Sequence, residues 1–490
     1  MKKIYYLLFL SSLTSLAQTQ IGSDINGEAA NDYSSRSVSL SSDGNIIAIG
    51  AAQNNGSGTD DAGHVRVYQN VSGVWTQIGA DIDGEANVDL SGVCVSLSSN
   101  GNIVAIGANA NDGNGNLSGH VRVYQNISGV WTQIGADIDG EASYDQSGES
   151  ISLSSDGSIV AIGARYNGGN GTNSGHVRVY QNVSGVWTKI GADINGEAAN
   201  DYSGYSIALS SDGSIVAIGA AQNDGNGTDS GHVRVYRNIS GVWTQIGADI
   251  NGEAANDQSG RSVALSSDGS IVAIGARLND GNGTDSGHVR VYQNISGVWT
   301  QIGADINGEA ANDYSGHSVA LSSDGSIVAI GAYQNDGNGT DSGHVRVYRN
   351  ISGVWTQVGT DINGEAAGDY CGYGISLSSN GNILAVGANY NDGNGTNSGH
   401  VRVYNLGVVL ASDSFVQSNL RVYPNPSNGI VNIALENNLQ LEKVSIYNQL
   451  GQLVKTTQAN IIPTTELAKG TYYVEVVTNQ GKATKKIVVP

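Results

Sequence analysis

The chain has 490 residues, enough for two or three domains; Gly accounts for 69 of them, and charged residues make up only 14%. A composition rich in Gly, Val, Ile, Ser and Tyr favours many short strands joined by tight turns and excludes a predominantly helical protein. The formal net charge of −21 argues against nucleic acid as a partner, because an acidic surface repels a polyanion.

The first seventeen residues have the pattern of a secretory signal peptide. Lys2 and Lys3 precede a short apolar run. Ser15 and Ala17 are small residues at the spacing that signal peptidase requires, so we expect cleavage after Ala17. The apolar run at residues 4–10 is too short to cross a bilayer, and no later segment approaches the roughly 20 apolar residues of a transmembrane helix. The sequence therefore predicts export and no transmembrane segment.

The motif GHVRVY recurs seven times between residues 63 and 404, with a constant step of 56 residues. Each unit contains four strand-like runs bounded by Gly, Asn, Asp or Ser. In the copy that begins at Trp243 these runs are WTQIGADI, RSVALS, SIVAIGA and HVRVYQN. Seven units of four antiparallel strands predict an all-β fold, a seven-bladed β-propeller over residues 18–404.

The two ends of the repeat region complement each other. The mature chain begins with TQIGSDI at residues 19–25, which aligns with the outer strand WTQIGADI, whereas the last repeat stops at HVRVYNLG and lacks that strand. An open solenoid would instead need polar capping repeats at both ends. We therefore expect residues 19–25 to pair with residues 400–404 and to close the ring.

The repeat pattern SG-x-S-[IV]-[AS]-LSSDG-[SN]-IVAIGA, followed by a loop and GHVRVY, resembles the FG-GAP repeats of integrin-α-type propellers over residues 18–404. The Pro of that family's GAP element is absent, as at residues 219–221, and LSSDG replaces the calcium-binding loop DxDxDG. The calcium sites of the family are therefore not expected in this chain.

After a linker at residues 405–419, residues 420–490 are expected to form a small β-sandwich with strands at IVNIAL, KVSIYN, TYYVEVV and KKIVV. Pro424 and Pro426 fix an extended segment that cannot continue a strand ladder. This region resembles the type A C-terminal sorting domain of the type IX secretion system of Bacteroidetes. The motif residues are Pro424, Asn425, Pro426, Gly451, Gly470 and Tyr472.

That resemblance implies an export route. The protein would reach the periplasm, cross the outer membrane through the type IX secretion machinery, and be secreted or attached to the cell surface.

The invariant side chains of the repeat favour structural roles. In GHVRVY, His232, Arg234 and Tyr236 project to one face of the strand, and we expect them to pack between blades, with Arg paired to a loop carboxylate. The Trp that opens each outer strand is expected to be a wedge between blades rather than a platform for sugars, and Gln18 takes its place in the first copy. Metal binding by the repeated His is not expected, because neighbouring copies would lie a blade apart.

Calcium is the one cofactor that the repeats leave open. The loop NDGNGTDSG presents Asp224, Asn226 and Asp229, and oxygen ligands at alternate positions suit calcium. Gly-Asn-Asp loops also serve purely as turns. Cys94 and Cys371 fall in different blades, so no disulfide is expected.

Three positions differ from blade to blade, and all three lie at the start of the inner strand or the end of the second strand. In an antiparallel pair these ends share one face of the disc, whereas the opposite turns, SSDG and ISG, are nearly constant. Tyr and Arg, which are enriched at binding hot spots, dominate the variable positions. The candidate ligand-binding residues are Tyr33, Arg36, Glu149, Arg165, Tyr166, Tyr202, Tyr205, Arg261, Arg277, Tyr314, His317, Tyr333, Tyr370, Tyr373 and Tyr390.

No nucleophile elbow, phosphate-binding loop or zinc motif is present, and the repeated carboxylates Asp249, Glu253 and Asp257 provide no differentiated pair of the kind a glycosidase needs. We therefore expect a non-enzymatic binding or adhesion protein with a glycan or protein ligand. A secreted polysaccharide-degrading enzyme or accessory is the first alternative. A structural component of the extracellular matrix is the second, with the variable face a product of neutral drift.

Overall fold

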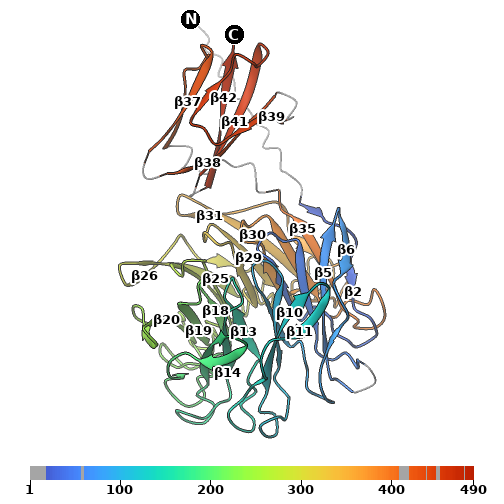
Figure 1. Cartoon of the computed structure of the whole chain (residues 1–490). Helices are drawn as coiled ribbons and strands as arrows, with labels where there is room; N and C mark the ends of the chain where they lie inside the picture. The colour runs from blue at the N-terminus through green and yellow to red at the C-terminus, as the bar shows by residue number, and fades with distance from the viewer. Residues whose placement is uncertain (1–17, 57–59, 408–418, 437–438, 449–452, 479–480) are drawn as a thin grey trace, which may run out of the picture. The chain divides into compact units, whose positions relative to one another are not determined.

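The computed structural model describes residues 18–56, 60–407, 419–436, 439–448, 453–478 and 481–490, so the expected signal peptide lies outside the described residues. The chain divides into two compact units, residues 1–407 and 408–490 (Figure 1). Nothing in the described part of the chain is a helix of the length and apolarity needed to cross a membrane.

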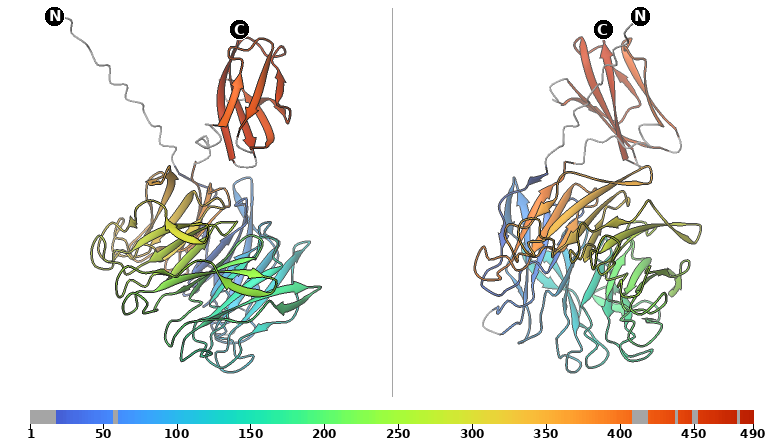
Figure 2. Two further views of the ribbon diagram at one scale, coloured as in Figure 1. Left: turned by 90° about the vertical axis from the view of Figure 1, so that its left-hand side faces the viewer. Right: turned by 180° about the vertical axis from the view of Figure 1, so that it is seen from behind.

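The first unit is a seven-bladed β-propeller, and its blades repeat one design (Figure 2). In blade one the order is β3-β4-β5-β6, with the short β7 also paired to β5. The strands of blade one are β3 (Ser37–Leu40), β4 (Ile46–Ala51), β5 (His64–Val71), β6 (Val74–Gln77) and β7 (Ile82–Asp83). Successive residues of β4 and of the first half of β5 are buried, so both faces of the blade are covered. The apolar core lies between blades, as in the cluster of Val233, Ile250, Val263 and Ile274.

The next five blades follow the same order. Blade two has β8 (Cys94–Leu97), β9 (Ile103–Ala108), β10 (His120–Ile127), β11 (Val130–Gln133) and β12 (Ile138–Asp139). Blade three has β13 (Ser150–Leu153), β14 (Ile159–Ala164), β15 (His176–Val183), β16 (Val186–Lys189) and β17 (Ile194–Asn195). Blade four has β18 (Ser206–Leu209), β19 (Ile215–Ala220), β20 (His232–Ile239), β21 (Val242–Gln245) and β22 (Ile250–Asn251). Blade five has β23 (Ser262–Leu265), β24 (Ile271–Ala276), β25 (His288–Ile295), β26 (Val298–Gln301) and β27 (Ile306–Asn307). Blade six has β28 (Ser318–Leu321), β29 (Ile327–Ala332), β30 (His344–Ile351), β31 (Val354–Gln357) and β32 (Ile362–Asn363).

Blade seven is completed by the start of the chain, which confirms the predicted closure. Its own strands are β33 (Cys371–Leu377), β34 (Ile383–Ala388) and β35 (His400–Asn405). β1 (Thr19–Gln20) and β2 (Ile25–Asn26) both pair antiparallel with β35, in the registers Gln20 to Tyr404 and Ile25 to Val401. The two ends of the propeller sequence therefore share one sheet.

The outer strand departs from the sequence prediction, because WTQIGADI is interrupted rather than continuous. In blade five it is split into β26 and β27, which pair with opposite halves of β25. Gly303 lies in the break with φ of 75°, a value outside the β region, and a Cβ on it would lie 2.9 Å from the ring of Trp355 in the next blade. The break makes room for that indole.

The invariant Trp residues join neighbouring blades, as expected for wedges. Trp299 Nε1 donates to the carbonyl oxygen of Ile246 in the preceding blade at 2.7 Å, and the five other Trp residues repeat this bond. At the seventh interface Gln18 Nε2 donates to the carbonyl oxygen of Val358 at 3.0 Å. A side-chain amide thus replaces the indole where the chain begins.

Close backbone contact near the axis explains the Gly in IVAIGA. A Cβ on Gly219 would lie 2.0 Å from the carbonyl oxygen of Gly260 in the next blade, and five other blades place a Gly against a Gly in the same way. In the remaining contact, Gly387 faces Ser35 of blade one. Any side chain at these positions would push two inner strands apart.

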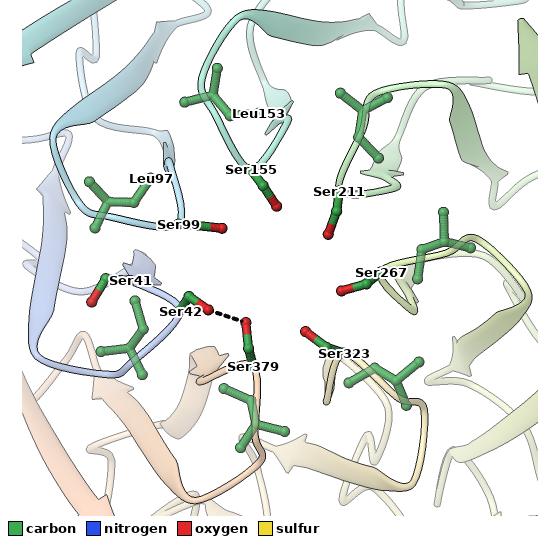
Figure 3. A pocket seen from close by; sticks show the side chains of 15 residues that line it. Ser41, Ser42, Leu97, Ser99, Leu153, Ser155, Ser211, Ser267, Ser323 and Ser379 are labelled. Carbon is green, nitrogen blue, oxygen red and sulfur yellow. Dashed lines mark hydrogen bonds between the residues drawn. The ribbon is translucent and has the colours of Figure 1, made fainter. Parts of the chain in front are cut away.

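At the constant end of the axis a closed circle of backbone hydrogen bonds joins all seven blades. Each Ser after the inner strand donates its N–H to the carbonyl of the equivalent Ser in the next blade, from Ser42 to Ser99 at 2.8 Å through to Ser379 back to Ser42 at 2.9 Å. Figure 3 shows most of the Ser hydroxyls turned toward the centre, with Ser42 bonded to Ser379 at 2.6 Å. They line a cavity of about 230 Å³, and one Leu from each blade lies behind them.

The second unit is a β-sandwich, as predicted, with more strands than expected. One sheet has the order β36 (Leu420–Tyr423), β37 (Ile430–Leu435) and β40 (Ile461–Pro463). The other has the order β39 (Leu453–Thr457), β38 (Leu441–Tyr447), β41 (Gly470–Thr478) and β42 (Gly481–Val489). The sequence analysis missed β36, β39 and β40. The buried side chains of both sheets, among them Val431, Ile446, Ile462 and Val474, form one core.

The closure strands can be tested by deleting residues 18–26. The deletion exposes one edge of β35, removes the buried side chain of Ile25 from the core and removes the carbonyl partner of Trp75, so the free energy of unfolding should fall by about 3 kcal/mol or more. Urea denaturation followed by Trp fluorescence measures the change. Deleting residues 420–490, which belong to the other compact unit, should leave the propeller transition in place. An unchanged midpoint after the first deletion would contradict the role assigned to closure.

Candidate functional site: the variable face of the propeller

The loops that carry the variable residues lie together at one end of the propeller, called here the variable face. The first residue of an inner strand pairs with the end of the second strand, as Ser206 does with Gly219. The long loop before the third strand is bridged to the loop that enters the next blade, as Gly231 is to Ser259. The variable positions therefore occupy the end of the axis opposite the Ser circle.

Around blades three to five the variable side chains form a connected chain of contacts. Glu149 pairs with Arg165 at 2.8 Å, and the Arg165 guanidinium lies 4.5 Å from the ring centre of Tyr205. Arg261 lies over the same Tyr205 ring at 4.0 Å. Tyr166 joins this chain through Arg165 at 4.7 Å. Arg165 and Arg261 thus both make cation–π contacts with the Tyr205 ring.

The chain continues through blades six and seven as a row of aromatic rings. His317 is buried between Tyr333 and Tyr373, with ring centres 4.4 and 4.5 Å away. Tyr333 contacts Tyr370 at 5.6 Å, and Tyr370 contacts Tyr390 at 4.7 Å. The other predicted tyrosines attach at the periphery: Tyr33 to Tyr390, Tyr202 to Tyr166, and Tyr314 to Tyr333. The fold therefore gathers the candidate side chains into one surface.

The sequence analysis did not include Gln258 or Val93 in this set. Gln258 Oε1 accepts from Arg277 Nη2 at 3.1 Å and fixes that guanidinium, and Val93 is buried at the position that Arg261 and His317 occupy in other blades. Both stand at positions that vary between blades, and that variation was the signal available in the sequence.

Four of the seven basic side chains that lie outside the GHVRVY motif are on the variable face of this acidic unit. Residues 18–404 contain 39 acidic and 14 basic side chains, a net charge of 14 − 39 = −25. Seven of the basic residues are the Arg of GHVRVY; the others are Arg36, Arg165, Arg261 and Arg277 on the variable face and Lys189, Arg237 and Arg349 in or beside the outer strands.

Three of these arginines have no carboxylate partner among the residues that the structure describes. Arg165 is neutralised by Glu149, whereas no ion pair involves Arg36, Arg261 or Arg277. Burial, then Arg261, Arg277 and Arg36, hold the pKa of His317 well below its usual value, so this imidazole is neutral. Burial also lowers the pKa of Arg261, with Arg277 and Arg165 adding to the effect. The centre of the face therefore carries three arginines that form no ion pair within the described residues, although Asp285 interacts electrostatically with Arg277.

The repeated His, Arg and Tyr side chains pack between blades, as expected. Arg234 Nη2 donates to the carbonyl oxygen of Asn195 in the preceding blade at 2.8 Å, and its Nη1 lies 3.4 Å from Glu197. The guanidinium also lies 5.5 Å from the ring centre of Tyr236. His232 is 1% exposed and faces the same Glu197. Each blade thus anchors its third strand on the loop of its predecessor.

Carboxylates that are neighbours in the sequence serve two different blade interfaces. In DINGEAAND of blade four, Asp249 faces His232 of its own blade, whereas Glu253 faces His288 of the next blade. Asp257 is buried and accepts from the backbone N–H of Ala254 and from Asn279 Nδ2. The sequence analysis treated the three as one set, which the fold separates.

The candidate calcium loop uses its polar side chains within the fold. Asp224 Oδ1 accepts from the backbone N–H of Asp229 at 2.9 Å, and Asn226 Nδ2 donates to the carbonyl oxygens of Gly252 and Glu253 at 2.9 Å. Burial and the nearby Asp224 raise the pKa of Asp229. These bonds account for the loop as a turn, and calcium binding there stays a prediction.

The motif residues of the second unit hold its edge strand. Asn425 Nδ2 donates to the carbonyl oxygen of Lys486 at 2.8 Å, and its Oδ1 accepts from Val488 N–H at 2.9 Å, so this side chain continues the sheet beside β42. Pro424 and Pro426 flank it after β36 ends. The Tyr472 hydroxyl donates to the carbonyl oxygen of Ala468 at 2.9 Å, and Gly470 begins β41. Gly451 lies outside the described residues.

The buried imidazoles predict a loss of stability in acid. Burial lowers the pKa of His176, His232, His288 and His344 to about 4, from 6.5. Between these values the unfolded chain binds protons that the folded chain does not, so the free energy of unfolding should fall as the pH drops from about 6.5 toward 4. Urea midpoints in EDTA at pH 7, 6, 5 and 4.5 measure the slope.

Two variants separate the imidazoles from the general charge of the protein. His232→Gln removes one such group and should reduce the slope. Arg237→Gln, which installs the residue that other blades have at this position, should keep it. A midpoint that does not move between pH 7 and pH 5 would contradict the assignment.

Comparisons with known proteins agree with this architecture. Residues 421–490 match the family described as secretion system C-terminal sorting domain, and residues 251–292 and 307–348 match the FG-GAP repeat. No curated protein matches the sequence.

Solved structures that resemble the chain share little sequence with it. The periplasmic gluconolactonase PpgL of Pseudomonas aeruginosa is 15% identical, with a TM-score of 0.48, over 91% of this chain and 99% of that one. U3-55K is 12% identical, with a TM-score of 0.47, over 79% of this chain and 98% of that one. At this level of similarity neither informs the function. The chain is a β-propeller with FG-GAP repeats at residues 251–292 and 307–348 and a C-terminal sorting domain of the type IX secretion system at residues 421–490, which directs it across the outer membrane to be secreted or displayed on the cell surface.

Proposed function

We propose that the protein is a non-enzymatic binding or adhesion protein of the cell exterior, and that the variable face grips an anionic glycan. The observation that carries this proposal is the group formed by Arg36, Arg261 and Arg277, which have no carboxylate partner among the described residues and surround the neutral His317. Partly buried cations without a counter-charge are costly, and an anionic ligand would offset that cost.

The residue types around the three arginines suit an acidic sugar polymer. A guanidinium presents paired N–H donors that match a carboxylate or sulfate group. Tyr373, Tyr333 and Tyr390 form the adjoining aromatic surface, and aromatic rings offer apolar faces for sugar rings. The acidic loops outside this centre would repel a polyanion that approached anywhere else, which favours a single docking position.

The sequence differences between blades lie in the loops, whereas the strands are nearly identical, as is usual in proteins that bind ligands through loops on a rigid scaffold. Blades differ at the positions of Arg36, Arg261 and His317, whereas GHVRVY is the same in each. A glycoside hydrolase would need one pair of carboxylates in different environments. On the variable face Glu149 forms an ion pair with Arg165.

Binding to alginate and chondroitin sulfate, with dextran as the neutral reference, tests the proposal. The mature protein should bind both acidic polymers and ignore dextran, and binding should weaken as salt is raised. Arg36→Ala combined with Arg277→Ala should weaken binding about tenfold or more, the equivalent of at least one lost charged contact. Biolayer interferometry on immobilised polymer gives the affinities.

The matched control is Arg237→Gln together with Arg349→Gln. These arginines lie on third strands, outside the variable face, and Gln occupies their position in other blades. The control should bind like the wild type. Equal loss of binding in both variants would show that only the overall charge of the protein matters. Binding to none of the polymers would favour a structural matrix component. Release of reducing ends from either polymer would overturn the non-enzymatic assignment.

Delivery to the cell exterior depends on the sorting domain and can be tested separately. A chain that lacks residues 420–490 should accumulate in the periplasm, because the type IX machinery would have no signal to act on. Cell fractionation with an antibody against the propeller measures this. A chain that keeps residues 1–17 and 405–490 but lacks the propeller should still reach the surface or the medium. Normal surface delivery of the first variant would contradict the prediction.

A further inference from the structure

We propose that each blade interface on the variable face is a binding site for a divalent transition-metal ion of the Zn²⁺ type, held by one His and two carboxylates. This inference is independent of the glycan proposal, because none of the ligand residues belongs to the Arg and Tyr surface.

Seven groups of this composition exist in the described part of the chain, one for each copy of GHVRVY. In the first, Nδ1 of His64 lies 3.7 Å from Oε2 of Glu28 and 3.8 Å from Oδ2 of Asp81. The three ligand atoms of a group lie within 4.8 Å of one another. Other groups are Glu85, His120 and Asp137; Glu141, His176 and Asp193; Glu197, His232 and Asp249; and Glu365, His400 and Asp24.

The His side chain supplies the evidence that these are more than clusters of acidic residues. His64, His288 and His344 are each 1% exposed, and their Nδ1 atoms have no hydrogen-bond partner, although His64 and His288 each face two carboxylates and His344 faces one. A separation of 3.7–4.0 Å is too long for a hydrogen bond. Two ligands bound to one zinc ion lie about 3.3–3.6 Å apart, so a small movement of the exposed Glu would seat an ion in the gap.

The remaining carboxylate oxygens are already engaged, which orients the free ones toward the imidazole. Gln77 Nε2 donates to Oδ1 of Asp81 at 2.6 Å and leaves Oδ2 facing His64. Arg66 lies 3.5 Å from Oε1 of Glu28 and leaves Oε2 facing the same ring. Contacts of this kind behind the ligands are typical of metal sites.

The donor set selects the class of ion. Calcium and magnesium prefer oxygen ligands alone, whereas imidazole with carboxylate suits zinc and its neighbours in the first transition row. A cavity of about 440 Å³ adjoins Glu28, His64 and Asp81, and it gives the ion an open side for water.

Differences between blades predict a ranking of the seven sites. Asp193 pairs with Lys189 at 2.8 Å, where the other blades have Gln, so the His176 site carries an extra positive charge and should bind most weakly. Asp83 and Asp139 replace an Asn of the other copies, and Asp83 lines the same cavity as His64. The His64 and His120 sites should therefore bind most tightly.

A competition titration of Zn²⁺ against a chromophoric chelator tests the proposal on the EDTA-stripped mature protein. The wild type should bind seven equivalents. Glu197→Gln, Glu253→Gln and Glu309→Gln combined should reduce this to four, because three of the sites lose a ligand. These Glu side chains are 43–44% exposed, so the substitutions should leave the fold intact. Lys189→Gln should strengthen the weakest class of site.

The matched control removes three carboxylates from the same blades without touching a ligand. Asp224→Asn, Asp280→Asn and Asp336→Asn keep the oxygen that accepts the loop N–H and should retain seven equivalents. Equal stoichiometry in both triple variants, or displacement of Zn²⁺ by equimolar Ca²⁺, would overturn the proposal. The absence of zinc binding would also overturn the proposal. In that case the Nδ1 atom that faces the two carboxylates would carry a proton.

Discussion

Seven backbone hydrogen bonds, each from the Ser of one blade to the equivalent Ser of the next, run in a closed circle around the propeller axis. Since the last bond returns from Ser379 to Ser42, every blade must meet its neighbours at the same spacing and angle. The constant SSDG turn, the Gly of IVAIGA and the Trp bond to the preceding blade all serve that one geometry. β1 and β2 then supply the seventh blade with the outer strands that the other six blades have within their own repeats.

The same constraint explains where the molecule can vary. Strands and the Ser end are fixed by blade-to-blade contacts, so sequence differences accumulate in the loops of the other end. Arg261 on Tyr205 and His317 on Tyr373 are contacts between neighbouring blades, each of which contributes one side chain. A surface with one asymmetric centre is thus built on a nearly symmetric frame.

Charge is arranged in two zones on the variable face. Around the axis lie arginines without carboxylate partners in the described residues, and farther out the His, Glu and Asp groups repeat at each interface. The Arg of GHVRVY stands beside the second zone, since Arg234 shares Glu197 with His232. The proposed cation sites and the proposed anion-binding centre therefore belong to different groups of side chains.

The sequence by itself determined the blade number, the closure of the ring and the sorting domain, because a fixed 56-residue step, a missing outer strand and a dense motif are properties of the chain in one dimension. It also placed the variable residues on one face of the disc, because the start of one strand and the end of its antiparallel neighbour lie at the same end. Only the tertiary structure decided which of them touch, and it separated Asp249 from Glu253 by sending each to a different His. The sequence did not predict the break in the outer strand, because its cause is the close approach of the Trp355 indole of the next blade to Gly303. Contacts between blades depend on how neighbouring repeats pack in space, which the sequence of one repeat does not specify.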